Sequence, residues 1–235
     1  MTEQEIQRVL VIAAHPDDAD IGCGGTMAKW CRQGKEVVYL ICTRGDKGSS
    51  DPDMTSERLS EIRTREQSAA GATIGVREVR FLDGRDGELL PTLELRKTMA
   101  EMVRHYRPDV IFTHDSTVHV YDRGNLNHPD HRVVGTTVLD VVYPISRDAL
   151  HYPDQLARGL RPHEVHEVYL FMANQPNMAF DITDTIGQKV EALREHKTQF
   201  PDAEWVDTWM RDRHREVGAL HAMAYAETFR HVITR

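Results

Sequence analysis

Two short segments of the sequence carry side chains that can bind a metal ion and move protons. The first is His15-Pro-Asp-Asp18, with Asp20 close behind it, and the second is His128-Pro-Asp-His131. Histidine and carboxylate ligands together are typical of a zinc site that keeps one position open for water, whereas calcium and magnesium prefer oxygen ligands. A loop that only caps the next helix would need one carboxylate and no histidine. We predict that the two segments converge on one metal ion.

The chemistry that such a centre supports is hydrolysis of an amide or an ester. A metal ion with an open position lowers the pKa of water to ~7 and polarises a carbonyl oxygen. The reaction also needs a base for the water, and a proton or positive charge for the oxyanion and the leaving group. The carboxylate and the histidine that remain after ligation, one from each segment, fit these two roles. The chain has no G-x-S-x-G segment that would offer a serine nucleophile instead.

Both segments follow apolar runs that are typical of buried strands. Residues 9–14 are mostly β-branched and do not alternate, and Pro16 then ends the strand. A helix and a second apolar run follow, so the chain begins with a βαβ unit of parallel strands and a right-handed crossover. Residues 110–113 form a later strand that runs straight into His114. Because open α/β sheets bind ligands at the carboxyl ends of their strands, the two segments should meet there.

The whole pattern predicts a single α/β domain over residues 1–235, a Rossmann-like three-layer sandwich with a mostly parallel central sheet. We expect strands at 9–14, 37–42, 76–82, 110–113, 167–172 and 180–184, and helices at 21–33, 55–75, 92–106, 128–142, 186–198 and 211–230. Residues 143–162 contain three prolines and predict an irregular excursion.

Composition excludes several classes of partner. The net charge of −8 argues against nucleic acid or an anionic membrane as the partner. No apolar run is long enough to cross a bilayer, and the polar start of the sequence does not resemble a signal peptide. The cysteines, Cys23, Cys31 and Cys42, have no spacing that suggests a disulfide framework or a zinc knuckle. We expect a cytoplasmic protein.

At the two metal-binding segments the sequence resembles the LmbE-like, or PIG-L-type, N-acetylglucosaminyl deacetylases. The family signature is A-H-P-D-D-x-E, followed about a hundred residues later by H-P-D-H, and the chain has both, at Ala14–Asp20 and His128–His131. The resemblance continues through Thr43-Arg-Gly45, the helix around Arg63, and His196-Lys-Thr-Gln199. Asp20 in place of the family glutamate is a departure that affects the surroundings of the ligands and not the ligands themselves.

The resemblance implies a zinc-dependent hydrolase that removes the acetyl group from an N-acetylglucosamine-type sugar or conjugate. It implies one Zn2+ per chain, with Fe2+ as the alternative, held by His15, Asp18 and His131. It implies that Asp17 is the general base for the water. His128, oriented by Asp130, would stabilise the oxyanion and protonate the amine.

Further expectations concern substrate contacts and partners. The resemblance implies that Arg63 contacts the substrate or the acetate product. From their positions alone, His114 would line the pocket, while Arg44 and Asp46 would hydrogen-bond a sugar. The expected partner is a small soluble N-acetylated sugar or conjugate, and relatives often assemble into homo-oligomers.

Three other functions compete with this interpretation. A zinc amidase that acts on another small amide conjugate would use the same centre. The segment Asp20-Ile-Gly-Cys-Gly-Gly25 resembles the glycine loop of S-adenosylmethionine-dependent methyltransferases, but the metal segment separates it from the strand. We therefore interpret its glycines as allowing close packing of the first helix. A non-catalytic sugar- or metal-binding module would be expected to lack the base or a ligand, and Asp17 and His128 are both present.

Overall fold

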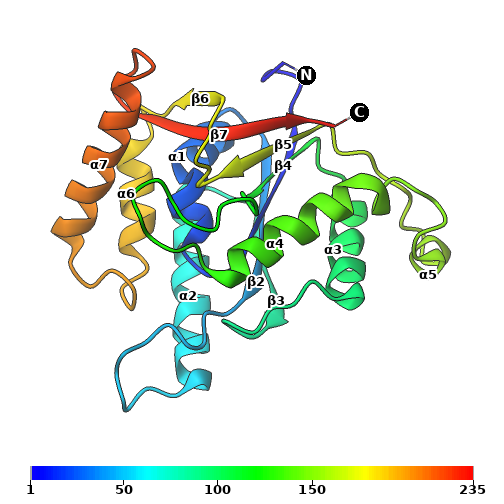
Figure 1. Cartoon of the computed structure of the whole chain (residues 1–235). Coiled ribbons are helices and arrows are strands. Elements are labelled where there is room, and N and C mark those ends of the chain that lie inside the picture. Colours follow the sequence, from blue (N-terminus) through cyan, green and yellow to red (C-terminus); the bar gives the residue numbers. More distant parts are fainter. Residues whose placement is uncertain (1, 235) are drawn as a thin grey trace.

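The computed structural model describes residues 2–234, which form an α/β fold with a seven-stranded sheet between two layers of helices (Figure 1). The strands are β1 (Arg8–Ala13), β2 (Glu36–Thr43), β3 (Glu78–Gly84), β4 (Val110–His114), β5 (Glu167–Phe171), β6 (Met178–Asp181) and β7 (Ala226–Ile233). The helices are α1 (Asp18–Arg32), α2 (Ser56–Ile74), α3 (Leu93–Tyr106), α4 (Pro129–Asp140), α5 (Pro153–Ala157), α6 (Ile186–Arg194) and α7 (Ala203–Ala219). The expected mostly parallel, Rossmann-like sandwich is confirmed.

The strand order is β3-β2-β1-β4-β5-β7-β6, and β1 to β5 are parallel. The chain moves outward from β1 to β3 in one direction and then continues from β4 in the other. The order therefore reverses between β1 and β4, and the connections that leave these two strands diverge. A crevice at that point is the place where doubly wound sheets bind ligands.

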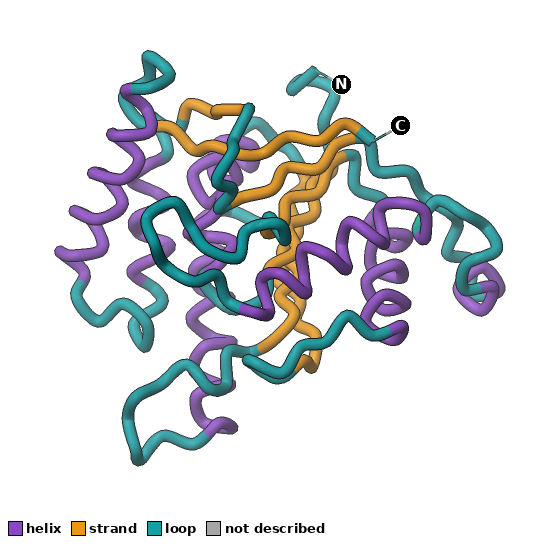
Figure 2. The backbone as a smooth tube through the Cα atoms, in the orientation of Figure 1, coloured by secondary structure: helices purple, strands orange, loops and turns teal. Residues whose placement is uncertain are grey.

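Side chains of β1 alternate between two separate cores, which explains why its sequence is apolar throughout. Val9, Val11 and Ala13 pack into the core with α1, α2 and α6, whereas Leu10 and Ile12 pack into the core with α3 and α4. Figure 2 shows the same arrangement, with helices on both sides of the strands. A strand that is buried on both faces cannot show the polar alternation of a half-exposed one.

Two of the three glycines of α1, Gly22 and Gly25, pack closely, as expected. A Cβ on Gly22 would lie 2.7 Å from the ring of Phe171, and a Cβ on Gly25 would lie 2.8 Å from Ile182. Both residues are inside the helix and do not form a nucleotide loop. This result supports the packing interpretation over the methyltransferase one.

The expected helix at 211–230 is wrong at both ends. Helix α7 begins at Ala203, where Asp202 caps it, and ends at Ala219. Residues Ala226–Ile233 instead form β7, which pairs antiparallel with both β5 and β6. Strand β7 is held by these two neighbours, and Phe229 on it enters the core. Long-range pairing of this kind outweighs local helix propensity.

The excursion at 143–162 is irregular, as expected, and a buried arginine holds it together. Residues Val141–Ile145 form an irregular turn after α4 in which Tyr143 is extended, and α5 is the short helix that follows. Arg104 of α3 is 1% exposed. Its five N–H groups bond to the carbonyl oxygens of Ile145, Ser146, Asp148 and His151 and to the side chain of Gln155.

Candidate metal centre and active site

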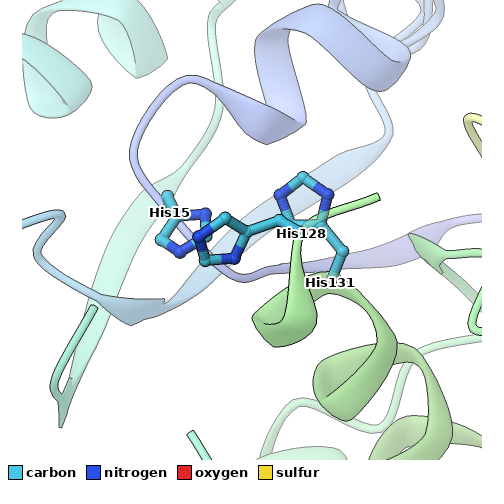
Figure 3. Close-up of side chains that lie close together, drawn as sticks. All are labelled: His15, His128 and His131. Atoms are coloured by element: carbon cyan, nitrogen blue, oxygen red, sulfur yellow. The ribbon is translucent and has the colours of Figure 1, made fainter. Parts of the chain in front are cut away.

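The site lies in the crevice between β1 and β4. The chain leaves β1 through His15 and Pro16 and enters α1 at Asp18, while α4 begins at Pro129 with His128 as its N-cap. The first turns of two helices therefore face the crevice, and their free N–H groups favour carboxylates there. Figure 3 shows His15, from the segment after β1, close to His128 and His131, from the start of α4. Two segments about a hundred residues apart thus form one site.

The three expected metal ligands come together around the carboxylate of Asp18. Its Oδ2 lies 3.2 Å from His15 Nδ1, and its Oδ1 lies 3.1 Å from His131 Nε2. The rings of His15 and His131 are 5.3 Å apart between centroids. Asp18 and both histidines are mostly buried.

The opposite nitrogen of each histidine ring is held by an oxygen acceptor. His15 Nε2 lies 3.1 Å from both Asp130 Oδ2 and Asp86 Oδ1. His131 Nδ1 lies 3.0 Å from Asn127 Oδ1. Metal-binding histidines usually have such a partner, which fixes the ring and its tautomer. The remaining nitrogens, which face Asp18, are therefore free to act as ligands.

The carboxylates of this cluster favour positive charge among the histidines. Burial alone would lower the pKa of His15, but hydrogen bonds to Asp130, Asp18 and Asp86 outweigh it and raise the pKa to about 12. Burial raises the pKa of Asp18, but His131 and His114 bring it well below its usual value. Ligand atoms of His15, His128 and His131 lie within 4.8 Å of one another, as do those of Asp18, His114 and His131. These donors fit a divalent metal ion.

Asp17, the expected base, has a constrained backbone. Its φ of 91° lies in the left-handed region that favours glycine, so the conformation needs support. The Gln67 side chain accepts a hydrogen bond of 2.8 Å from the Asp17 N–H. Arg63 donates to Asp17 Oδ2 at 3.1 Å and to the carbonyls of Pro16 and Gly45. Burial raises the pKa of Asp17 to about 6, against the lowering effect of Arg63.

Asp20, the residue that departs from the family signature, supports the conformation of Asp17 through buried hydrogen bonds. Its Oδ2 accepts hydrogen bonds from Gln67 Nε2 at 2.8 Å and from His196 Nε2 at 2.9 Å. Asp20, Gln67 and His196 are all fully buried. The chain of contacts therefore runs from His196 through Asp20 and Gln67 to the backbone of Asp17. Hydrogen bonds to Asp20 raise the pKa of His196 against the opposing effect of burial.

His128 lies at the open side of the centre. Its ring is edge-on to His15, with centroids 4.5 Å apart, and its side chain is 40% exposed. Its Nδ1 accepts a hydrogen bond from the Asp130 backbone N–H. Burial and the charges of His15 and His131 lower the pKa of His128. Its protonated form is consequently a stronger acid toward a leaving amine.

Four expectations about side chains need refinement or correction. The expected contact of Asp130 with His128 is made by its backbone N–H, whereas its carboxylate contacts His15 and the N–H groups of Gly87 and Leu89. His114 is 1% exposed and lies behind the ligands, where its Nε2 accepts a hydrogen bond from the Ala14 N–H, so it cannot line a pocket. Burial lowers its pKa to about 3.

Arg44 also lies away from the centre. Its guanidinium bonds to Thr64 and Asp83 and lies over the ring of Phe81. Side-chain contacts with α2 and β3 thus keep it from the crevice. Asp46, expected to bind sugar, instead accepts a hydrogen bond from the Asp86 N–H.

Asp86 is a residue of the candidate site that was not expected from the sequence. It stands in Asp83-Gly-Arg-Asp-Gly87, which we interpreted only as a turn. It follows β3, so it lies at the same sheet edge as the two metal segments and reaches His15. A carboxylate at the carboxyl end of a parallel strand was the available signal.

Comparisons with known proteins agree with this geometry. The family model for PIG-L, described as GlcNAc-PI de-N-acetylase, matches residues 10–142. Diacetylchitobiose deacetylase of Thermococcus kodakarensis is 33% identical over 230 residues, 97% of this chain and 84% of that protein. A 1D-myo-inositol 2-acetamido-2-deoxy-alpha-D-glucopyranoside deacetylase of Thermomonospora curvata is 33% identical over 150 residues, 53% of this chain and 48% of that protein.

A solved structure extends the similarity to nearly the whole fold. N,N'-diacetylchitobiose deacetylase from Pyrococcus horikoshii, in complex with an inhibitor, superposes with a TM-score of 0.90 at 32% identity, covering 98% of this chain and 85% of that one. In residues 2–234 no helix is long and apolar enough to cross a membrane. The family model covers more than half of the chain and the Thermococcus relative covers nearly all of it, so the chain belongs to the PIG-L (LmbE-like) family of N-deacetylases.

Proposed function

We propose that the protein is a zinc-dependent hydrolase that removes the acetyl group from a small N-acetylglucosamine-type sugar or conjugate. The observation that carries the proposal is the grouping of His15, Asp18 and His131 within one crevice, beside a carboxylate and a histidine that remain free for chemistry. The names of the relatives support an N-acetylated sugar as the substrate class.

In this proposal His15 Nδ1, the Asp18 carboxylate and His131 Nε2 hold one metal ion per chain. Asp130 and Asp86 keep the His15 ring in place, and Asn127 does the same for His131. Such a metal ion, when bound, would polarise the amide carbonyl and lower the pKa of water, so that the water can lose a proton and attack the carbonyl carbon. The histidine and carboxylate ligands suit Zn2+ and, as the alternative, Fe2+.

Asp17 and His128 would divide the proton transfers. The Asp17 carboxylate, with its pKa of about 6, is mostly ionised at neutral pH and can accept a proton from the attacking water. His128 can donate a proton to the amide nitrogen as the carbon–nitrogen bond breaks. The products are acetate and a free amine. Arg63 would act chiefly by holding Asp17, since all its described contacts lie on the side of the base and its neighbouring loops.

An acetate-release screen tests the proposal. The zinc-loaded protein is offered diacetylchitobiose, N-acetylglucosaminyl inositol, a methyl N-acetylglucosaminide and an acetylated amine without a sugar. We expect hydrolysis of at least one sugar and a loss of about 10²-fold or more in Asp17→Asn. Asp83→Asn, which changes an exposed carboxylate, should be unaffected. Hydrolysis of the non-sugar amide alone would favour a different amidase, and bound zinc without any hydrolysis would favour a binding module.

A further inference from the structure

A cavity of about 530 Å³ opens directly onto the proposed metal ligands Asp18 and His131. Residues of the segment that follows β5 and of the loop before α4 form two of its walls, and Trp209, Arg213 and Val217 of α7 form the third. These α7 residues are spaced by four, so they share one face of the helix. An acetyl group would occupy a small part of this volume, which is in the range of cavities that hold whole small ligands, ~300–1,000 Å³.

Arg213 is the unusual group in this cavity. It is half-buried, and within residues 2–234 it makes no hydrogen bond or ion pair. Arginines in such positions normally have a carboxylate or several carbonyl partners, as Arg104 has in this chain. A guanidinium that is partly removed from water and faces a cavity lacks a partner that a ligand can provide.

The surroundings of Arg213 select for negative charge. Burial and the nearby Arg123 both lower the pKa of Arg213, which means that its positive charge is poorly compensated. Glu227, a carboxylate that acts on it, is already bonded to Lys189 and Thr26. Asp122 also lines the cavity but is exposed. A bound metal ion would add further positive charge on the other side.

We propose that this cavity is the subsite for the group attached to the N-acetylated sugar, and that the group carries a carboxylate or a phosphate that pairs with Arg213. Trp209, stacked on Trp205 with centroids 4.9 Å apart, offers a fixed aromatic surface for the apolar face of a sugar ring. Guanidinium groups bind carboxylate and phosphate through two parallel hydrogen bonds, which makes Arg213 a determinant of specificity. This inference rests on the proposed function.

A second cavity, beside His128, is a weaker candidate for binding the charged group of the substrate. It contacts the centre only through His128, and its arginine, Arg132, already donates to the Asn127 carbonyl at 2.8 Å. The cavity along α7 has two proposed ligand residues in its wall, and its Arg213 has no hydrogen-bond or ion-pair partner among residues 2–234. The charged part of the substrate therefore fits the α7 cavity better.

The test compares matched substrates with the zinc-loaded protein. The methyl and carboxymethyl glycosides of N-acetylglucosamine differ by one carboxylate, and N-acetylglucosamine 1-phosphate provides the phosphate arm. We expect kcat/KM to be about tenfold or more higher for at least one anionic compound than for the methyl glycoside. Arg213→Gln should bring that ratio close to one, and Arg213→Lys should keep part of it. Arg215→Gln, an exposed arginine on the same helix, should leave the ratio unchanged.

If the protein is active on the panel, either of two results would overturn the subsite. One is an equal kcat/KM for neutral and anionic compounds, which would leave the deacetylase function standing. The other is an anion preference that survives Arg213→Gln. If the wild-type protein hydrolyses none of the compounds, the proposed function fails on this panel, and calorimetric binding of the carboxymethyl glycoside then decides. Binding that Arg213→Gln abolishes supports the subsite, and absence of binding refutes it.

Discussion

Glu227 is a buried carboxylate whose removal should destabilise the fold strongly. It is 1% exposed and accepts hydrogen bonds from Lys189 Nζ at 2.6 Å, from the Gly25 N–H at 2.9 Å, and from the N–H and hydroxyl of Thr26. It joins β7 to α1 and α6. Glu227→Gln removes the negative charge that neutralises the buried Lys189 ammonium, and its amide NH2 cannot accept a hydrogen bond where one of the two carboxylate oxygens did. Breaking a buried pair from one side costs about 3–5 kcal/mol.

Urea and thermal unfolding measure this loss. At about 2–4 °C per kcal/mol for a chain of this size, Tm should fall by about 6–20 °C. Lys189→Met should cost a similar amount, and the double variant should lose much less than the sum because no unpaired charge remains. The exposed pair Arg215–Asp212 is the control, and its loss should cost about 1 kcal/mol or less. A Glu227→Gln protein within about 1 kcal/mol of wild type, or additive single losses, would refute the reasoning.

The same residue gives a pH dependence. Burial alone would raise the pKa of Glu227, but Lys189, His214 and the hydrogen bonds to it lower the pKa below its usual value. Its stabilisation is therefore present above the pKa of the unfolded chain, about 4.3, and is lost as pH falls through the folded pKa. Unfolding free energies measured downward from pH 6 should fall less steeply in Glu227→Gln than in wild type. Parallel curves would contradict this expectation.

Three further predictions concern other parts of the molecule. Arg104→Gln leaves several buried carbonyls without donors and should lower stability by about 3–5 kcal/mol; a Tm within about 3 °C of wild type would count against it. Asp86→Asn should weaken zinc binding by about 10–100-fold, because Asp86 orients His15; an unchanged affinity in a chelator competition would exclude that role. His196→Phe should lower kcat by about tenfold or more with little change in KM, because Asp17 loses support through Asp20 and Gln67. His196→Gln should keep most of the wild-type kcat. Equal kcat in the wild type and both variants would show that His196 does not help to position Asp17.

Most of the sheet and the proposed metal ligands could be predicted from the sequence because both depend on local patterns. A buried strand such as β1 shows as an apolar run, and Pro16 marks its end. The paired metal segments then follow from the rule that parallel strands end at one edge. His15, Asp18 and His131 could be brought together on that rule and the family resemblance alone.

The wrong predictions concern residues whose structure depends on contacts with distant parts of the chain. Strand β7 has an Ala- and Glu-containing start that also suits a helix, and only its pairing with β5 and β6 makes it a strand. Asp130 and Asp86 both reach His15 because the loop after β3 lies beside α4, which no pattern within either segment encodes. Arg44 has the right position in the chain, but Thr64 and Asp83 hold its side chain elsewhere.

The most direct test of the central claim is a zinc titration of the metal-free protein in which calorimetric binding and acetate release are followed together. We predict one zinc per chain, with activity that rises in step with occupancy. Asp17→Asn should bind the same single zinc without recovering activity, and His131→Ala should lose both. Acetate release that needs no metal, or full zinc binding in His131→Ala, would contradict the account.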